Sequence, residues 1–179
     1  MLRFVPILLA LAAPVRADCP DVPDIASEID RLVAQLREAG SEGAAGPIAG
    51  RMWEQWLRAP DAKAQGLLDS GLERLRVGDF AGARASFDAL IAYCPDYAEG
   101  WNQRAFVSFL SGDMAAALPD LDRAIALQPR HVGALSGRGL TLIALGREAE
   151  GHDAIRAATA LNPWLTERHL LPEAQGTDL

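Results

Sequence analysis

The stretch AQGLLDSGLERLRVGDFAGARASFDALIAYCPDY, residues 64–97, decides the fold. Leu67, Gly71 and Leu75 recur at helical spacing until Gly78 interrupts the pattern. Asp79 is placed to cap a second helix, which Pro95 ends because proline cannot continue the backbone hydrogen bonding. Ala83, Phe87, Leu90 and Ile91 form the apolar stripe of that second helix. The stretch therefore predicts a pair of antiparallel helices joined by a tight turn.

The same pattern returns twice at an interval of 34 residues. The matching positions are Pro95, Pro129 and Pro163; Gly78, Gly112 and Gly146; Gly71, Ala105 and Gly139; Ala83, Ala117 and Gly151; Phe87, Leu121 and Ile155; Leu90, Ala124 and Ala158; and Leu67, Trp101 and Leu135. Repeats of this length are supersecondary units that bury their apolar faces by stacking on one another. The sequence therefore predicts three consecutive helical hairpins, over 64–97, 98–131 and 132–165.

These blocks resemble tetratricopeptide repeats, through Trp101 with Ala105, Ala83 with Phe87, and the three prolines. The resemblance implies an all-α fold, a right-handed α-solenoid of helix hairpins over residues 63–165. The chain departs from the family pattern at two columns: Ser70, Arg104 and Arg138 replace the usual Leu, and Arg74, Ser108 and Leu142 replace the usual Tyr. In this family an Arg-Gly pair such as Arg138-Gly139 has an acidic partner in a second helix, for which Asp120 and Asp122 are the candidates. In block two, Asp96 and Glu99 have the spacing of a capping box.

The segments on either side of the repeats are also expected to be helical. Apolar residues mark one helix from Ile25 to Leu36 and another from Ile48 to Trp56. Counting back 34 residues from Ala83, Phe87 and Leu90 gives Ala49, Trp53 and Trp56. We therefore interpret residues 18–62 as a degenerate hairpin that caps the stack before the first repeat. Residues 166–179 are expected to form a C-terminal cap, with a short helix over 164–171, and a mobile tail.

The first 17 residues have the features of a signal peptide. Arg3 is followed by an apolar run from Phe4 to Ala13, and Val15 and Ala17 suit cleavage after Ala17. The alternative is an uncleaved anchor, although the run is shorter than the roughly 20 residues that span a bilayer. We expect an exported protein, periplasmic or secreted, without stable membrane insertion after cleavage.

The charge argues against some partners. The whole chain has a net charge of −7, and removing Arg3 and Arg16 with the signal leaves 15 basic and 24 acidic residues, a net charge of −9. Such a surface repels phosphate backbones, so we expect no nucleic-acid partner.

The two cysteines, Cys19 and Cys94, could form a disulfide in an oxidising compartment. Two free thiols are the alternative, because sequence spacing does not show whether the sulfur atoms meet.

No catalytic motif is present. The histidines, His131, His152 and His169, lie 21 and 17 residues apart, so no two of them share a helical face as metal ligands. We expect them on the solvated surface, and we expect no catalytic residue, no metal and no cofactor. The chain is interpreted as a non-enzyme.

The resemblance implies a concave groove formed by the first helix of each block. The groove positions proposed to bind a partner are Leu68, Leu72, Arg76, Glu99, Asn102, Phe106, Phe109, Leu110, Ser136, Leu140 and Ile143. The family's charged clamp for a peptide carboxylate is missing, because Leu68, Leu72, Gly133 and Gly137 occupy its places. The groove is expected to be apolar with a polar fringe, and it is either open or filled by the N-terminal segment.

The leading hypothesis is a protein–protein interaction module that binds a peptide or protein segment, as a scaffold or assembly factor in the cell envelope. A periplasmic holdase or assembly chaperone with many clients is the alternative. The sequence indicates neither the partner nor the oligomeric state.

Overall fold

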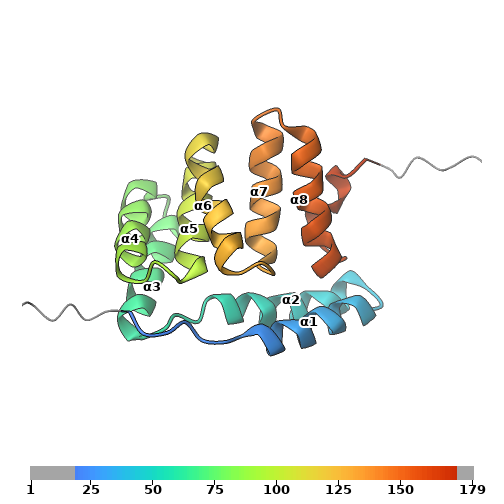
Figure 1. Ribbon diagram of the computed structural model, residues 1–179, viewed down its shortest axis with the longest axis horizontal. Helices are drawn as coiled ribbons and strands as arrows, with labels where there is room; N and C mark the ends of the chain where they lie inside the picture. Colours follow the sequence, from blue (N-terminus) through green and yellow to red (C-terminus); the bar gives the residue numbers. More distant parts are fainter. Residues whose placement is uncertain (1–18, 173–179) are drawn as a thin grey trace, which may run out of the picture.

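The computed structural model describes residues 19–172, and this part of the chain is all helical (Figure 1). Its elements are α1 (Ala26–Glu38), α2 (Glu42–Trp56), α3 (Ala62–Arg76), α4 (Phe80–Tyr93), α5 (Ala98–Leu110), α6 (Met114–Leu127), α7 (Val132–Ala144), α8 (Glu148–Leu161) and the short 3-10 helix η1 (Thr166–Leu170). The signal peptide expected over 1–17 and the tail from 173 lie outside the described residues.

Three helix hairpins form the body of the fold, as the 34-residue repeat predicts. The pairs α3–α4, α5–α6 and α7–α8 pack most closely, and α4 packs on α5 and α6 on α7. Gly78, Gly112 and Gly146 end the first helix of each pair with φ between 76° and 79°, a left-handed conformation that glycine adopts without steric cost. The predicted cap is confirmed, because the Asp79 carboxylate accepts a hydrogen bond from Gly82 N at 2.9 Å. The result is an all-α solenoid with its turns on one side.

Arginine–aspartate pairs connect successive hairpins. The Arg138 Nε donates to Asp122 at 2.7 Å, so of its two predicted partners Asp122 is the one used. The other candidate, Asp120, instead accepts two hydrogen bonds from Arg104, which also reaches Asp88 at 2.8 Å. Hydrogen bonds to these carboxylates, Asp120 first, hold the pKa of Arg104 above its ordinary value. The arginines that replace the consensus Leu therefore each pair with an aspartate of the preceding repeat, and Arg104 also pairs with Asp120 of its own hairpin.

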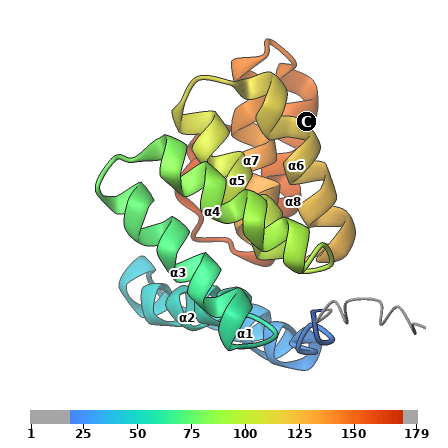
Figure 2. The same ribbon diagram turned by 90° about the vertical axis from the view of Figure 1, so that its left-hand side faces the viewer.

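The N-terminal hairpin α1–α2 is present, but the structure corrects its expected place. Instead of continuing the stack beyond α3, it runs beneath the upright helices toward α8 (Figures 1 and 2). One apolar core joins the hairpin to the third repeat, and its buried members are Ile29, Leu32, Val33, Leu36, Ala45, Met52, Trp56, Val132, Leu135 and Ala158. Although α2 resembles a repeat helix in sequence, its apolar residues are buried against α7 and α8, and this burial stabilises the observed position.

Polar contacts fix the hairpin to the C-terminal end of the stack. Arg37 donates to the carbonyl of Ala160 at 2.9 Å, and the Trp164 indole N–H donates to the carbonyl of Leu36 at 3.0 Å. The ion pair between Asp30 and Arg130 adds a contact with the α6–α7 turn. The 3-10 helix η1 packs on α8, close to where the sequence predicts a short terminal helix.

The opposite end of the hairpin is fixed to the first repeat. Cys19 and Cys94 form a disulfide with their Cα atoms 5.1 Å apart, which confirms the predicted bridge. The Tyr97 hydroxyl donates to the carbonyl of Trp56 at 2.7 Å, and burial raises the pKa of Tyr97 above its usual range. The hairpin thus spans the stack and is held at both ends.

Candidate functional site

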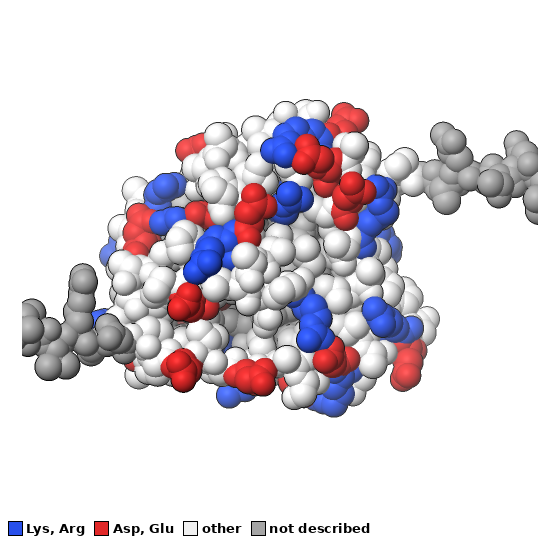
Figure 3. Space-filling model, in the orientation of Figure 1, with Lys and Arg blue, Asp and Glu red and all other residues white. Residues whose placement is uncertain are grey.

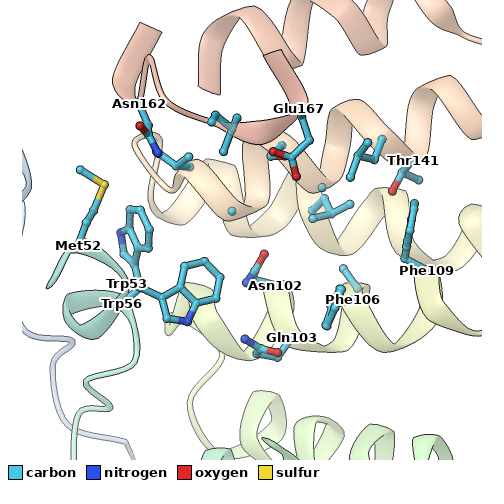
Figure 4. Close-up of a pocket in the computed structure, with 18 of the residues that line it drawn as sticks. Met52, Trp53, Trp56, Asn102, Gln103, Phe106, Phe109, Thr141, Asn162 and Glu167 are labelled. Carbon is cyan, nitrogen blue, oxygen red and sulfur yellow. The ribbon is translucent and has the colours of Figure 1, made fainter. Parts of the chain in front are cut away.

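A hollow of about 510 Å³ lies where the concave side of the stack meets the N-terminal hairpin (Figure 4). Helices α5 and α7 contribute the largest share of its lining, α3 contributes Leu72 and Leu75, and the segment after α8 contributes Asn162, Leu165 and Glu167. Ligand pockets in proteins commonly have volumes of about 300–1,000 Å³. The hollow is therefore large enough to take part of a bound molecule.

Helix α2 closes one end of the hollow. Trp53 and Trp56 lie at this end, and Phe106 and Phe109 lie at the other (Figure 4). Phe106 is 47% exposed, and Leu110, one helical turn further along α5, is 44% exposed. The hollow is therefore closed by tryptophans toward the hairpin, and apolar side chains remain in contact with solvent toward the turns.

The structure brings only some of the predicted groove residues together. Those that line the hollow are Leu72, Asn102, Phe106, Phe109, Ser136 and Leu140, and those outside it are Leu68, Arg76, Glu99, Leu110 and Ile143. Leu68 is buried in the core of the first repeat, and Arg76 pairs on the surface with Glu73. The groove is neither fully open nor filled, because the hairpin covers one end of it and leaves the hollow.

A buried polar cluster behind the tryptophans contradicts two predictions. His131 is fully buried instead of solvated; its Nε2 lies 2.7 Å from a Glu99 carboxylate oxygen and its Nδ1 accepts from Ala134 N. The Glu99 carboxylate also accepts from Gln103 and Asn102, so it does not form a capping box. Asp96, the other residue of the predicted capping box, does not cap α5 either, because the N-cap residue is Tyr97, which makes no side-chain capping bond.

This cluster holds α2 in place. The Trp56 ring stacks on His131, with centroids 4.4 Å apart and planes 14° apart. The Trp53 ring meets both of them edge-on. Because Glu99 accepts the hydrogen bond that orients His131, the polar cluster of α5 positions the aromatic end wall. Neither Glu99 nor His131 lines the hollow itself.

The repeat pattern does not predict that Trp53 and Trp56 close the end of the hollow, but one glycine in the sequence is consistent with a group packed at this place. Gly133 occupies a groove position on α7, and a Cβ there would lie 2.6 Å from Trp53 Cζ3. A groove position without a side chain is a sign that another group packs against the backbone. The other residues missed at the sequence level, such as Gln103 and Thr141, lie on faces that the family's groove positions do not include.

The electrostatic character of the hollow follows from its lining. Among the described lining residues there is no lysine or arginine, and Glu167 is the charged residue. The nearby Arg168 turns away, donating to the carbonyls of Trp164 and Leu165. On the molecular face of Figure 3, acidic and basic side chains are interspersed rather than gathered by sign.

Three polar atoms in the walls are buried without a hydrogen-bond partner in the described chain: Trp56 Nε1, Ser136 Oγ and Thr141 Oγ1. Within residues 19–172, no group of three or more His, Cys, Asp or Glu side chains is placed to hold a metal ion. None of the helices described is long and apolar enough to cross a bilayer.

A tetratricopeptide repeat family model matches residues 68–122 and 109–163, which together span more than half of the chain. The chain belongs to the tetratricopeptide repeat family. Its three hairpins α3–α8 are the tetratricopeptide repeats, and the α1–α2 hairpin lies outside the matched region.

Relatives share the tetratricopeptide repeats but not the whole chain. A TPR repeat-containing protein of Rhizobium etli is 30% identical over 120 residues, which are 67% of this chain and 59% of the relative. A tetratricopeptide repeat protein 36 homolog of Nematostella vectensis is 43% identical over 61 residues, 34% of each chain. The chain thus spans from about a third to three fifths of the length of these relatives.

Solved structures share the fold. The first tetratricopeptide repeat domain of Spaghetti (RPAP3), bound to the HSP90 peptide SRMEEVD, superposes with a TM-score of 0.58 at 24% identity. The match covers 60% of this chain and 86% of that domain. At this identity the similarity establishes the tetratricopeptide solenoid and not the ligand.

Proposed function

We propose that this protein is a non-catalytic interaction module that binds a peptide or protein segment on the concave side of its repeats. The observation that carries the proposal is the hollow, whose lining combines Trp53 and Trp56 with Phe106, Phe109 and Leu140. An apolar concavity with a few polar groups is the usual form of a binding site. The peptide in the complex of the Spaghetti domain supports a peptide-sized ligand for this fold.

We further propose that the protein acts outside the cytoplasm, as a scaffold or assembly factor of the cell envelope. The Cys19–Cys94 disulfide supports this location, because such bonds persist in oxidising compartments. The signal-like sequence of residues 1–17 points in the same direction. Expression of the full chain with a C-terminal tag, followed by cell fractionation, tests the location; an uncleaved chain in the cytoplasm would contradict it.

Affinity capture from envelope extract tests the binding site. The bait is the purified chain, compared with Phe106→Asp and with Phe109→Asp, which place a carboxylate in the hollow. The matched control is Val77→Asp, because Val77 is an exposed apolar residue that does not line the hollow. Partners retained by the control and lost by the two phenylalanine variants support the site. Partners that all three variants retain would show that binding occurs elsewhere.

A holdase with many clients is the second candidate, favoured by exposed apolar residues at the hairpin turns. Val77, Phe80 and Leu145 are among the most exposed large apolar side chains, and all three lie outside the hollow. Protection of several unrelated aggregating proteins, weakened by Val77→Asp, would favour this role over a dedicated scaffold. Capture of one partner without such protection would favour the scaffold.

A further inference from the structure

The hollow is closed at one end, and this geometry restricts what can occupy it. Trp53 and Trp56 of α2 lie across the end. Helices α5 and α7 form most of the remaining lining, and α3 and the segment from Asn162 to Glu167 add to it. An extended segment that enters from the Phe106 side therefore meets the indole rings and cannot continue along the groove. An open repeat groove would have no such end.

The chemistry of the walls restricts the occupant further. The apolar rings leave room for a large apolar group, and removing the surface of such a side chain from water favours binding. The Glu167 carboxylate lies across the hollow from Asn102 and Gln103 (Figure 4), and no ion pair involving it is present in the described chain. A carboxylate brought into this space would be partly desolvated, repelled by Glu167 and without a basic partner.

We propose that the closed end of the hollow is an anchor pocket for one aromatic or large aliphatic side chain of the partner. The residues next to this anchor in the partner are uncharged or basic, and acidic segments are excluded. The α1–α2 hairpin, through Trp53, is thus a specificity determinant that the repeats alone do not provide. This inference rests on the proposed peptide-binding function and specifies the chemistry of the partner.

Selection from a phage-displayed random dodecapeptide library on the immobilised full chain tests the inference. Enriched sequences should share a bulky apolar residue and lack Asp and Glu beside it. Synthetic versions of these peptides should bind Trp53→Ala and Phe106→Asp at least about tenfold more weakly than the original chain, since 1.4 kcal/mol corresponds to tenfold. Val77→Asp should bind them unchanged.

Charge reversal at Glu167 provides a second, independent arm. Glu167 is partly exposed and forms no described ion pair, so Glu167→Lys should leave the fold intact. The same library selected on Glu167→Lys should now tolerate acidic residues beside the anchor. An unchanged exclusion of acidic residues would overturn the electrostatic part of the inference.

Different results would contradict the anchor pocket and the peptide-binding function. Enriched peptides that are acidic, that lack a bulky residue, or that bind Trp53→Ala and Phe106→Asp as well as the original chain overturn the anchor pocket. Those results would leave a peptide-binding function in place. A library that yields no peptide above background on any form of the chain overturns both the function and the anchor.

Discussion

Gly133 on α7 lies directly against the indole ring of Trp53 on α2, so close that a Cβ at position 133 would be 2.6 Å from Trp53 Cζ3. The two residues are 80 positions apart in sequence, and their contact places the N-terminal hairpin over the third repeat. Because Gly133 has no Cβ, the Trp53 ring can pack against the α7 backbone and close the end of the hollow.

Gly133→Ala should lower the free energy of unfolding by about 1–2 kcal/mol, because overpacking exceeds the gain in helix propensity. Gly66→Ala is the matched control: Gly66 is an exposed α3 residue whose Cβ would meet nothing within 4 Å. The control should gain up to about 1 kcal/mol. When Trp53→Ala removes the indole ring, Gly133→Ala should stabilise the chain, as Gly66→Ala does. Urea denaturation measures the original chain and the four variants, and the same sign of the Gly133→Ala effect in both backgrounds would refute the contact.

The buried carboxylate of Glu99 should matter far more than an exposed one. Glu99→Ala leaves the donors of Gln103 and His131 without an acceptor, and it should cost about 3 kcal/mol. Glu73→Ala, which breaks an exposed pair with Arg76, should lower the free energy of unfolding far less, because solvent screens that pair. Chemical denaturation of the two variants gives the comparison, and equal losses would contradict the structural role of the cluster.

Thr141 is a site where removing a polar atom should not harm the fold. Its hydroxyl is buried and has no partner within the described residues, so Thr141→Val should leave stability unchanged or raise it by about 1 kcal/mol. Ser108→Ala serves as the contrast, because the Ser108 hydroxyl accepts from Arg84 and donates to the carbonyl of Arg104. That variant should lose about 1 kcal/mol in thermal or urea unfolding. A clear loss for Thr141→Val would reveal a partner of this hydroxyl.

The Cys19–Cys94 disulfide connects residues 75 positions apart and should contribute about 2–4 kcal/mol by restricting the unfolded chain. Cys19→Ser should lower the urea midpoint accordingly, and a reducing agent should shift the original chain to the same midpoint. The variant itself should not respond to the reductant, which makes it the control. If the reductant leaves the urea midpoint of the original chain unchanged, the disulfide is not formed in solution.

The three helix hairpins of the repeats can be predicted from the sequence because the interactions that form them are local. The 34-residue interval, the turn glycines and the cap at Asp79 act within one hairpin or between neighbours, and the structure contains each of them. The disulfide was also predicted, as a matter of compartment rather than geometry.

The place of the N-terminal hairpin could not be read in the same way. Trp53 and Trp56 align with Phe87 and Leu90 at the repeat interval, which favoured packing on the first repeat. Their actual contacts, with Gly133 and His131, depend on which apolar face of the stack remains uncovered after the repeats assemble. The burial of His131 has the same cause, since an inter-repeat turn is normally solvated unless another element covers it.

The α1–α2 hairpin is attached to the first repeat at one end and to the α8 end of the stack at the other. Its contacts therefore depend on the distance between the first and last repeats. In an open solenoid, each unit contacts only its neighbours, so no contact depends on the total number of units. Here an extra 34-residue unit would carry α8 away from Leu36 and Arg37, and a missing one would leave the hairpin overhanging. The hairpin therefore matches the length of an array of three repeats, because it contacts the first repeat at one end and the third at the other.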